Sequence, residues 1–405
     1  MREALLLIGV VMEWVIIPLL GFSLIHALVS MRLLRRLGPT EPASGDTISD
    51  VSVLVPARNE EARIRDCLAS LAAQHPPVRE VILLDDRSTD RTGEIARELG
   101  FREEAGCRLR LIHGTDLPEG WIGKNWACHQ LSKVADPSSS HLLFTDADTV
   151  HGTGCVSAAL AYARSVRADL LSLWPDQITG TWSEKLIIPL GYLLFMSFQP
   201  FLFLRWLQLD PARAQRLGLD RRRLAGLGAA NGQFLLFRRE AYDSLGGHEA
   251  LRDHLVEDIA FGRRVASRTG EGMRLFNADG INLLKCRMYT DFAGVWEGFS
   301  KNMRPVFEES PKSFLLFGIV IFGLFLLPFL MFPWIPSAGI AVGLILLNRF
   351  VLTLRFRTSW FGFLAHPFAI VLALLVALNS WRLCLRRGIV WKGRVYSGAT
   401  RSVID

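Results

Sequence analysis

The chain has 405 residues, of which 50% are hydrophobic, and its formal net charge is +7 at pH 7. This length allows more than one folded unit, and the hydrophobic share is high for a protein that is soluble throughout. The basic residues gather beside apolar segments, which favours a membrane surface over nucleic acid as partner. The six cysteines lie far apart without a C-x-x-C pair, which indicates free thiols in a reducing compartment rather than a disulfide framework or a zinc site.

The N-terminal segment is long and apolar. Residues 4–30 contain only three interruptions, and the run is long enough to span a bilayer. A cleaved signal peptide is the alternative, but the run exceeds a typical signal-peptide core and has no obvious small-residue cleavage site. Three arginines follow within residues 32–36, and such an excess of positive charge marks the cytoplasmic side. We therefore expect an uncleaved anchor over residues 1–36 and a linker over residues 37–50.

Strands alternate with helices in the next part of the chain. Apolar runs at residues 51–56, 81–84, 109–112 and 142–144 predict buried strands, separated by stretches suited to helices. This order indicates parallel β-α-β units whose sheet is covered on both faces. In such sheets, ligands bind outside the carboxyl ends of the strands. The sequence therefore predicts an α/β domain, over residues 51–310, with its site at that edge.

Acidic residues follow two of these strands. Asp85 and Asp86 end the second strand, and Asp146 and Asp148 follow the fourth. Residues i and i+2 of an extended chain point to the same face, so the latter pair is placed to grip one divalent cation. Hard oxygen ligands suit Mg²⁺ or Mn²⁺, and Mg²⁺ is usually held by one or two carboxylates plus substrate phosphates. The pair predicts a metal that carries a nucleotide diphosphate; two solvated aspartates in a turn are the alternative.

Two further polar stretches suggest chemistry. Gly123 stands beside Lys124, so that backbone and ammonium can approach a phosphate together. A surface loop capped by Asn125 is the alternative, and the spacing is not that of an ATP-binding phosphate loop. Glu257 and Asp258 open a later helix, where the helix dipole favours carboxylates. This pair is either structural or supplies a general base at the mouth of the site.

An apolar segment, residues 186–207, interrupts the α/β pattern. It is long enough to cross a membrane, but a crossing would separate Glu257 and Asp258 from the earlier aspartates. We therefore expect this segment to lie in the membrane interface or to be re-entrant. A buried core helix is the alternative.

The C-terminal part contains three more apolar segments, residues 313–334, 336–354 and about 360–383. Each is long enough to span a membrane, which predicts about three transmembrane helices within residues 311–385. A basic tail, residues 386–405, follows. One span in front and three behind would leave this tail outside, whereas its charge predicts the cytoplasmic side. The sequence leaves this conflict open.

Over about residues 51–305, the order of these stretches resembles the family 2 glycosyltransferases with the GT-A fold. The matching stretches read VLVPARNE at residues 53–60, DDRSTD at 85–90, D-x-D at 146–148 and E-D at 257–258. The resemblance implies a nucleotide-sugar site made by Pro56, Ala57, Arg58, Glu60, Asp85, Asp86, Lys124, Asp146 and Lys301. It assigns the metal to Asp146 and Asp148, catalysis to Asp258 with Glu257, and the acceptor side to Gly232, Gln233 and Trp296.

The chain departs from many membrane members of this family at the next motif. It reads WEGFSKN at residues 296–302 in place of Q-x-x-R-W, so that Lys301 would take over the phosphate contact of the arginine. This variant, with GKNW at 123–126 and WKGRVY at 391–396, is most similar to the hopanoid-associated bacterial glycosyltransferases. It is also similar to ceramide glucosyltransferases and carotenoid-acid glycosyltransferases.

The resemblance implies an inverting enzyme, dependent on Mg²⁺ or Mn²⁺, that moves one sugar to a membrane lipid such as a hopanoid or another isoprenoid. The donor is expected to be a nucleotide diphosphate sugar, specifically a UDP-sugar. The expected location is the bacterial inner membrane, with several spans, a cytoplasmic catalytic domain and no nucleic-acid partner. The alternatives are a processive polysaccharide synthase, which lack of Q-x-x-R-W disfavours, and a non-catalytic membrane scaffold, which the intact acidic motifs disfavour.

Overall fold

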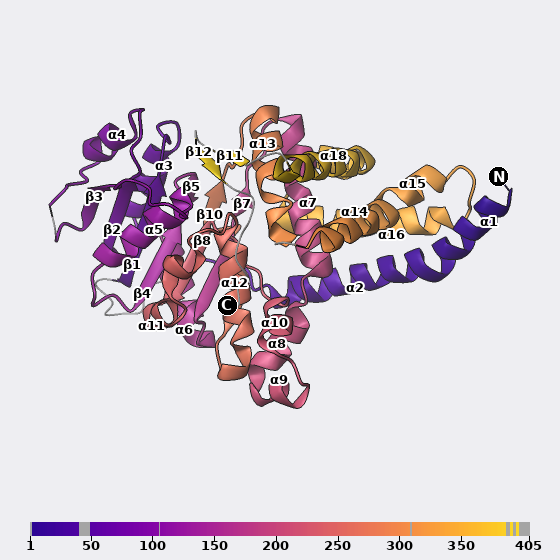
Figure 1. Cartoon of the computed structure of the whole chain (residues 1–405), viewed down its shortest axis with the longest axis horizontal. Helices are drawn as coiled ribbons and strands as arrows, with labels where there is room; N and C mark the ends of the chain where they lie inside the picture. Colours follow the sequence, from indigo (N-terminus) through magenta and orange to yellow (C-terminus); the bar gives the residue numbers. More distant parts are fainter. Residues whose placement is uncertain are drawn as a thin grey trace. The chain divides into compact units, whose positions relative to one another are not determined.

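The computed structural model describes residues 2–39, 49–104, 106–307, 310–385, 389–391 and 394–396. Most of the predicted linker and of the predicted basic tail therefore lies outside the described residues. The described chain divides into two compact units (Figure 1). The sheet unit contains Leu34–Ile178 and Phe203–Met288, and the helical unit contains the described residues of Met1–Leu33, Thr179–Leu202 and Tyr289–Thr400. The domain expected over residues 51–310 thus includes parts of both units.

A seven-stranded sheet forms the centre of the sheet unit, in the order β3-β2-β1-β4-β8-β6-β9. Its strands are β1 Ser49–Ala57, β2 Val78–Asp85, β3 Leu109–His113, β4 His141–Thr145, β6 Leu170–Trp174, β8 Phe234–Arg238 and β9 Leu275–Asp279. Strand β8 runs antiparallel to β4 and β6, and the other neighbouring pairs are parallel. The predicted mostly parallel α/β fold is confirmed, and all four predicted strands are neighbours in this sheet.

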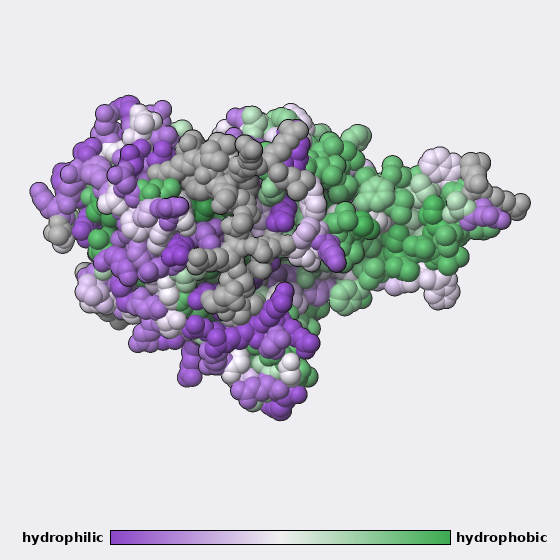
Figure 2. Space-filling model, viewed as in Figure 1, coloured by the Kyte–Doolittle hydropathy of each residue, from purple (hydrophilic) through white to green (hydrophobic). Residues whose placement is uncertain are grey.

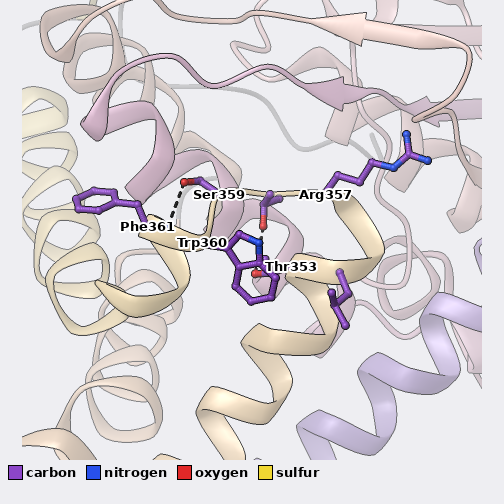
Figure 3. Close-up of a pocket in the computed structure, with 7 residues that line it drawn as sticks. Thr353, Arg357, Ser359, Trp360 and Phe361 are labelled. Atoms are coloured by element: carbon purple, nitrogen blue, oxygen red, sulfur yellow. Dashed lines mark hydrogen bonds between the residues drawn. The ribbon is translucent and has the colours of Figure 1, made fainter.

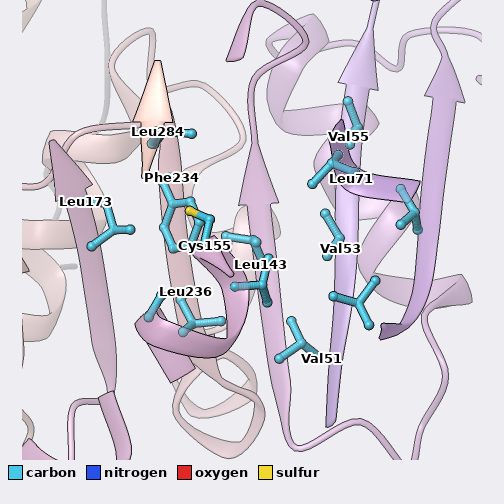
Figure 4. Packing of buried hydrophobic residues seen from close by; sticks show 14 of the residues in the cluster. Val51, Val53, Val55, Leu71, Leu143, Cys155, Leu173, Phe234, Leu236 and Leu284 are labelled. Carbon is cyan, nitrogen blue, oxygen red and sulfur yellow. The ribbon is translucent and has the colours of Figure 1, made fainter. Parts of the chain in front are cut away.

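Helices cover both faces of this sheet, which explains why its strands read as continuous apolar runs. On one face, Val51, Val53 and Val55 of β1 pack with α3 (Ile64–Ala72) and α6 (Cys155–Val166) (Figure 4). On the other face, Leu54 packs with α5 (Gly123–Val134) and α12 (Glu257–Ser267). Because successive side chains of a strand alternate between faces, one strand contributes to both clusters. The sheet unit also contains α4 Thr92–Glu98, α9 Ala212–Arg216, α10 Arg221–Ala225 and α11 Arg239–Ser244.

A smaller sheet begins where the fourth strand of the large sheet ends. It consists of β5 (Thr149–His151), β10 (Leu284–Cys286) and β7 (Asp176–Gln177), in that order. Strand β4 ends at Thr145 and β5 begins at Thr149. The D-x-D stretch, residues 146–148, is therefore a three-residue link between two sheets.

Three helices of the helical unit are long and apolar enough to cross a membrane, among the residues that the structure describes. They are Glu3–Leu33, α16 (Ala338–Phe356) and α18 (His366–Leu385). The first of them consists of α1 (Arg2–Val11), a π-helical stretch (Met12–Ile16) and α2 (Ile17–Leu33). Large apolar side chains are exposed along them, and Figure 2 shows a hydrophobic surface over this unit. Such an extended exposed apolar surface requires an apolar environment. The N-terminal span and two C-terminal spans are thus the candidates.

The predicted span over residues 313–334 is wrong as a single helix. Helix α14 (Pro311–Phe325) is 15 residues long and is followed after a break by α15 (Leu327–Met331). Pro328 has no backbone N–H to donate to the preceding helical turn, and α14 ends at Phe325, with Leu326 between the two helices. The hydropathy of the sequence shows that the segment is apolar, but it does not show where the helix is interrupted.

The segment predicted to lie in the membrane interface forms two helices. They are α7 (Trp182–Phe198) and α8 (Phe201–Leu209), which are bent by 49° relative to each other. Most of the α7 side chains are buried against α2, α16 and the short α17 (Trp360–Leu364) in the helical unit. The bend is that of a broken span or a re-entrant loop, and the interfacial placement stays a prediction. The remaining elements of this unit are α13 Phe292–Asn302 and the pair β11 Ile389–Trp391 and β12 Arg394–Tyr396.

Candidate active site

The first part of the site lies at the ends of β1 and β2. Asp86 donates its backbone N–H to the carbonyl of Ala57 (2.7 Å), and Arg58 donates to the carbonyl of Asp86 (2.9 Å). The side chains of Asp85 and Asp86 are almost buried, and Asp85 Oδ1 accepts the backbone N–H of Ser88 (3.0 Å). The structure thus brings together Ala57, Arg58, Asp85 and Asp86, as the positions of the strand ends predicted.

Two other predicted donor residues lie next to this group. Pro56 is the penultimate residue of β1, paired in register with Leu84 of β2. Glu60 donates its backbone N–H to Thr92 Oγ1 (2.9 Å), and its carboxylate pairs with Arg63 (3.7 Å). The negative charge of Glu60 also acts on Asp148, which places Glu60 between the first strand end and the D-x-D link.

Lys124 joins two motifs that are far apart in the sequence. Its ammonium lies 2.6 Å from Asp146 Oδ1 and 2.7 Å from Glu257 Oε1. Burial disfavours the charged ammonium, but the carboxylates of Asp146 and Glu257 outweigh it and hold the pKa of Lys124 well above its usual value. The D-x-D link and the start of helix α12 are therefore parts of one site.

Asn125 explains how the two motifs are held together. This side chain is fully buried and donates to the carbonyls of Leu251 (2.5 Å) and His254 (2.9 Å). The backbone N–H of Ile122 donates to the carbonyl of Arg252 (2.7 Å). These bonds fasten the segment that precedes Glu257 to the first turn of α5. The alternative of a surface loop capped by Asn125 is therefore wrong. The hydrogen bonds from Asn125 to the segment before Glu257 could not be predicted from the spacing of residues in the sequence.

Asp148 is a carboxylate with properties that suit it to bind a cation. Its Oδ1 is buried and has no hydrogen-bond partner among the residues that the structure describes. Burial raises the pKa of Asp148 to about 7, and the charges of Asp146 and Glu60 add to this rise. A divalent cation would stabilise the ionised form. Two adjacent carboxylates with an orphaned buried oxygen thus fit a hard metal ion.

The described residues contain no group of three or more His, Cys, Asp or Glu side chains placed to hold a metal. Asp146 and Asp148 would therefore supply only part of a coordination shell. This matches the usual way in which Mg²⁺ is bound, by one or two carboxylates together with substrate phosphates and water.

Asp258 is the second carboxyl group with a raised pKa in this site. Its Oδ2 accepts the backbone N–H of Gly232 (2.7 Å), and its Oδ1 accepts that of Ile259 (2.8 Å). Burial raises the pKa of Asp258 to about 6, with a contribution from Glu257, while Lys124 and the two amides oppose the rise. A Cβ atom at position 232 would lie 3.0 Å from Asp258 Oδ2, so glycine allows this close approach.

Gln233 connects the large sheet to the small one. It is buried, donates from Nε2 to Cys286 Sγ (2.9 Å) and accepts at Oε1 from Gln177 (2.6 Å). Gln177 and Cys286 come from β7 and β10 and were not predicted, because nothing in their local sequence marks them. Trp296 and Lys301 lie on α13 in the helical unit, so their predicted roles, like the acceptor roles of Gly232 and Gln233, stay predictions.

Comparison with known proteins finds two matching family models and several similar proteins. Residues 52–205 match the family model described as Glycosyl transferase family 2, and residues 212–402 match Glycosyl transferase family 21. The 4,4'-diaponeurosporenoate glycosyltransferase of Staphylococcus aureus strain MRSA252 is 27% identical over 361 residues, covering 86% of this chain and 88% of the relative. The counterpart from strain USA300 is 27% identical over 362 residues, with the same coverage.

Two solved structures are also similar. A mannosyltransferase from Pyrobaculum calidifontis, in complex with GDP-Man and Mn²⁺, is 17% identical, with a TM-score of 0.47 over 92% of this chain and 99% of that chain. Glucosyl-3-phosphoglycerate synthase from Mycobacterium tuberculosis is 17% identical, with a TM-score of 0.40 over 69% of this chain and 89% of that chain.

The fold and the family matches define an enzyme class, that of the glycosyltransferases. More particularly, residues 52–205 are similar to family 2 of these enzymes and residues 212–402 are similar to family 21.

Proposed function

We propose that this enzyme moves one sugar from a nucleotide diphosphate sugar to a hydroxyl or carboxyl group of a membrane lipid, with inversion at the anomeric carbon. The observation that carries the proposal is the Lys124 ammonium, which contacts both Asp146 (2.6 Å) and Glu257 (2.7 Å). This contact joins the stretch suited to a metal-bound diphosphate to the helix that carries Asp258. Donor groups and a candidate base therefore belong to one site.

On the donor side, a divalent cation, Mg²⁺ or Mn²⁺, is proposed to bind Asp146 and Asp148. When bound, such an ion neutralises charge that develops on the leaving diphosphate. Arg58, Asp85 and Asp86 are proposed to contact the nucleoside, specifically that of a UDP-sugar. The orphaned Oδ1 of Asp148 supports the metal assignment.

On the acceptor side, Asp258 is proposed to take the proton of an attacking hydroxyl. Its two backbone hydrogen bonds fix the orientation of the carboxylate, and a positioned base of raised pKa suits this task. Glu257 is proposed to position Lys124 and the start of α12. Gly232 and Gln233 support the acceptor side from the turn before β8, and Lys301 and Trp296 are proposed to complete the site.

A lipid acceptor is supported by two independent observations. The curated relatives are named for 4,4'-diaponeurosporenoate, a carotenoid acid, and the helical unit of this chain exposes large apolar side chains. An isoprenoid lipid, either a carotenoid acid or a hopanoid, is therefore the proposed acceptor class. A carboxylate acceptor is already ionised at pH 7 and needs no base, whereas a hydroxyl does.

The location proposed for the enzyme is the bacterial inner membrane, with the sheet unit in the cytoplasm. Arginines follow the N-terminal span, and basic residues follow the last span. An excess of positive charge favours the cytoplasmic side, both for the start of the sheet unit and for the tail. Helix α16 runs in the same direction as α2, since Ile335 lies beside Gly9 and Asn348 donates to Ser23. The number of long helices therefore does not assign a side to the basic tail, and its cytoplasmic placement is proposed from its charge alone.

The direct test uses the full chain and compares the lipids of bacterial cells with and without it by mass spectrometry. We expect one isoprenoid lipid to gain the mass of one sugar in cells that contain the protein. If the acceptor group is a hydroxyl, this glycosylated lipid should be absent from cells that carry Asp258→Asn. A ladder of several sugars would point to a processive enzyme. An unchanged lipid profile, together with no release of nucleotide diphosphate by the purified protein, would refute the proposal.

The pH dependence of the reaction follows from the pKa of Asp258. A general base acts in its deprotonated form, so kcat/KM with a hydroxyl acceptor should fall as the pH drops through about 6, the raised pKa of this carboxyl. The measurement is a pH profile at saturating Mn²⁺, which keeps the metal site loaded. A carboxylate acceptor should not show this inflection, and a hydroxyl acceptor with a flat profile from pH 5 to pH 8 would contradict the role of Asp258.

A further inference from the structure

The helical unit contains a pocket between the end of α16 and the start of α17, with a volume of about 550 Å³ (Figure 3). Its lining combines the side chains of Arg357, Thr358, Ser359 and Trp360 with the apolar Leu354. We call this the α16–α17 pocket. It lies outside the sheet unit, and the reaction proposed above does not use it.

Arg357 is the charged group of the pocket. It is exposed and forms no salt bridge with any residue that the structure describes. Its φ of 52° places it in the left-handed region at the end of α16, a position at which glycine or asparagine is less strained. A strained backbone carrying an unpaired guanidinium at the mouth of a pocket indicates a role for that side chain in binding.

The hydroxyl groups beside Arg357 add further hydrogen-bond donors. Thr358 Oγ1 donates to Thr353 Oγ1 (3.3 Å), and Ser359 Oγ accepts the backbone N–H of Phe361 (3.2 Å). Because the Ser359 hydroxyl accepts in this bond, its own hydrogen remains available to a ligand. Figure 3 shows the side chains of Arg357 and Ser359 pointing in opposite directions, so the guanidinium is the group of this lining that suits a phosphate, whose oxygens it can bind in a bidentate manner.

The position of the pocket along the helices places it at a membrane boundary. Helix α16 runs in the same direction as α1 and α2, because Asn348 donates to Ser23 (3.3 Å) and Ile335 lies beside Gly9. The end of α16 therefore lies near the end of α2 that carries Arg32, from which the chain continues into the sheet unit.

Other groups at this level are those expected at a boundary between lipid and water. Gly362 of α17 packs against the backbone carbonyl of Lys185, so the first turn of α7 lies beside α17. Trp360 is 51% exposed, and tryptophan and cationic side chains typically mark such a boundary. Leu354 is 56% exposed on the adjoining apolar surface of α16.

We propose that the α16–α17 pocket binds the phosphate headgroup of an anionic phospholipid in the leaflet at the Arg32 end of α2. Arg357 binds the phosphate, Trp360 lies at the level of the headgroup, and an acyl chain follows Leu354 along α16. Basic pockets between membrane helices bind anionic headgroups in this way. The proposal does not depend on the sugar transfer.

The test is titration of the purified full-length protein in neutral detergent with phosphatidylglycerol, followed by native mass spectrometry. Arg357→Gly removes the guanidinium and relieves the left-handed backbone, so the fold should be retained. We expect this variant to lower phosphatidylglycerol affinity about fivefold or more. Arg382→Ala is the matched control, because it removes one exposed cation from the end of α18, away from the pocket lining, and should leave the affinity unchanged.

Equal losses in the two variants would show that charge acts diffusely and would overturn the proposal. Inorganic phosphate is the second probe: if it binds as tightly as phosphatidylglycerol and displaces it, the pocket is a free-anion site and the assignment to a lipid fails. Arg357→Asn, which also tolerates the left-handed region, repeats the test if the glycine variant melts at a lower temperature. Binding of phosphatidylcholine with the same affinity would likewise contradict an anionic headgroup.

Discussion

Asp258→Asn should lower turnover with a hydroxyl acceptor by about 10²–10⁴-fold, the usual contribution of a positioned general base. Asparagine keeps the size of the side chain but cannot take a proton at neutral pH. The measurement is the initial rate of nucleotide diphosphate release with a lipid extract as acceptor. Binding of the nucleotide sugar should change little, because the donor stretches follow strands β1, β2 and β4, whereas Asp258 lies on helix α12.

The structure shows which control this experiment needs. Both carboxylate oxygens of Asp258 accept backbone N–H groups, from Gly232 and Ile259. Asparagine has one oxygen and one NH₂ group, so one of these amides loses its acceptor, and the melting temperature must be measured alongside the rate. Glu257→Gln keeps a hydrogen bond to Lys124 and should cost less activity. A near-normal rate of Asp258→Asn with a hydroxyl acceptor would remove the base assignment, whereas a near-normal rate only with a carboxylate would identify the acceptor class.

Asp148→Ala should weaken the binding of UDP in the presence of Mn²⁺ by about 10²-fold or more. Outer residues that orient metal ligands already contribute 10–100-fold to affinity, and Asp148 is proposed to be a direct ligand. In the absence of metal, the free energy of unfolding should not fall, because the variant loses a buried oxygen that has no hydrogen-bond partner. Isothermal titration with UDP, with and without Mn²⁺, and chemical denaturation provide the two measurements.

Glu240→Ala is the matched control for Asp148→Ala. Glu240 is 84% exposed in its side chain and follows β8 at the opposite edge of the sheet, so its loss should leave UDP binding unchanged. UDP affinity that stays at the parental value in Asp148→Ala with Mn²⁺ would show that the metal is bound elsewhere. A large loss of stability instead would show that this carboxylate is structural.

The sequence predicted those parts of the fold that local pattern determines. Apolar runs mark β1, β2 and β4, because each is buried on both faces, and acidic residues directly after β2 and β4 mark the strand ends. The edge strand β3 is only partly buried and was predicted from a shorter pattern. The antiparallel insertion of β8 between β4 and β6 was not predicted, since it depends on pairings between segments far apart in the chain. The same holds for the small sheet, whose strands are two or three residues long.

The sequence predicted individual residues of the candidate site but not the contacts between them. Asp146, Lys124 and Glu257 stood out separately, but only the folded chain shows that one ammonium contacts both acids. Asn125 was interpreted as a cap because asparagine is common at helix starts, whereas its buried amide holds a distant segment. Long-range contacts of this kind leave no periodic signal in the sequence.

The three-residue link between β4 and β5 has a consequence for ligand affinity. Thr149 Oγ1 donates to the carbonyl of Asp146 (2.7 Å), and strand pairing holds the residues on either side of the link. The two aspartates are therefore preorganised, and the conformational entropy of ordering them is lost when the chain folds rather than when the donor arrives. Changes that loosen the pairing of β5 with β10 should thus appear as weaker donor binding even where the acidic side chains themselves are untouched.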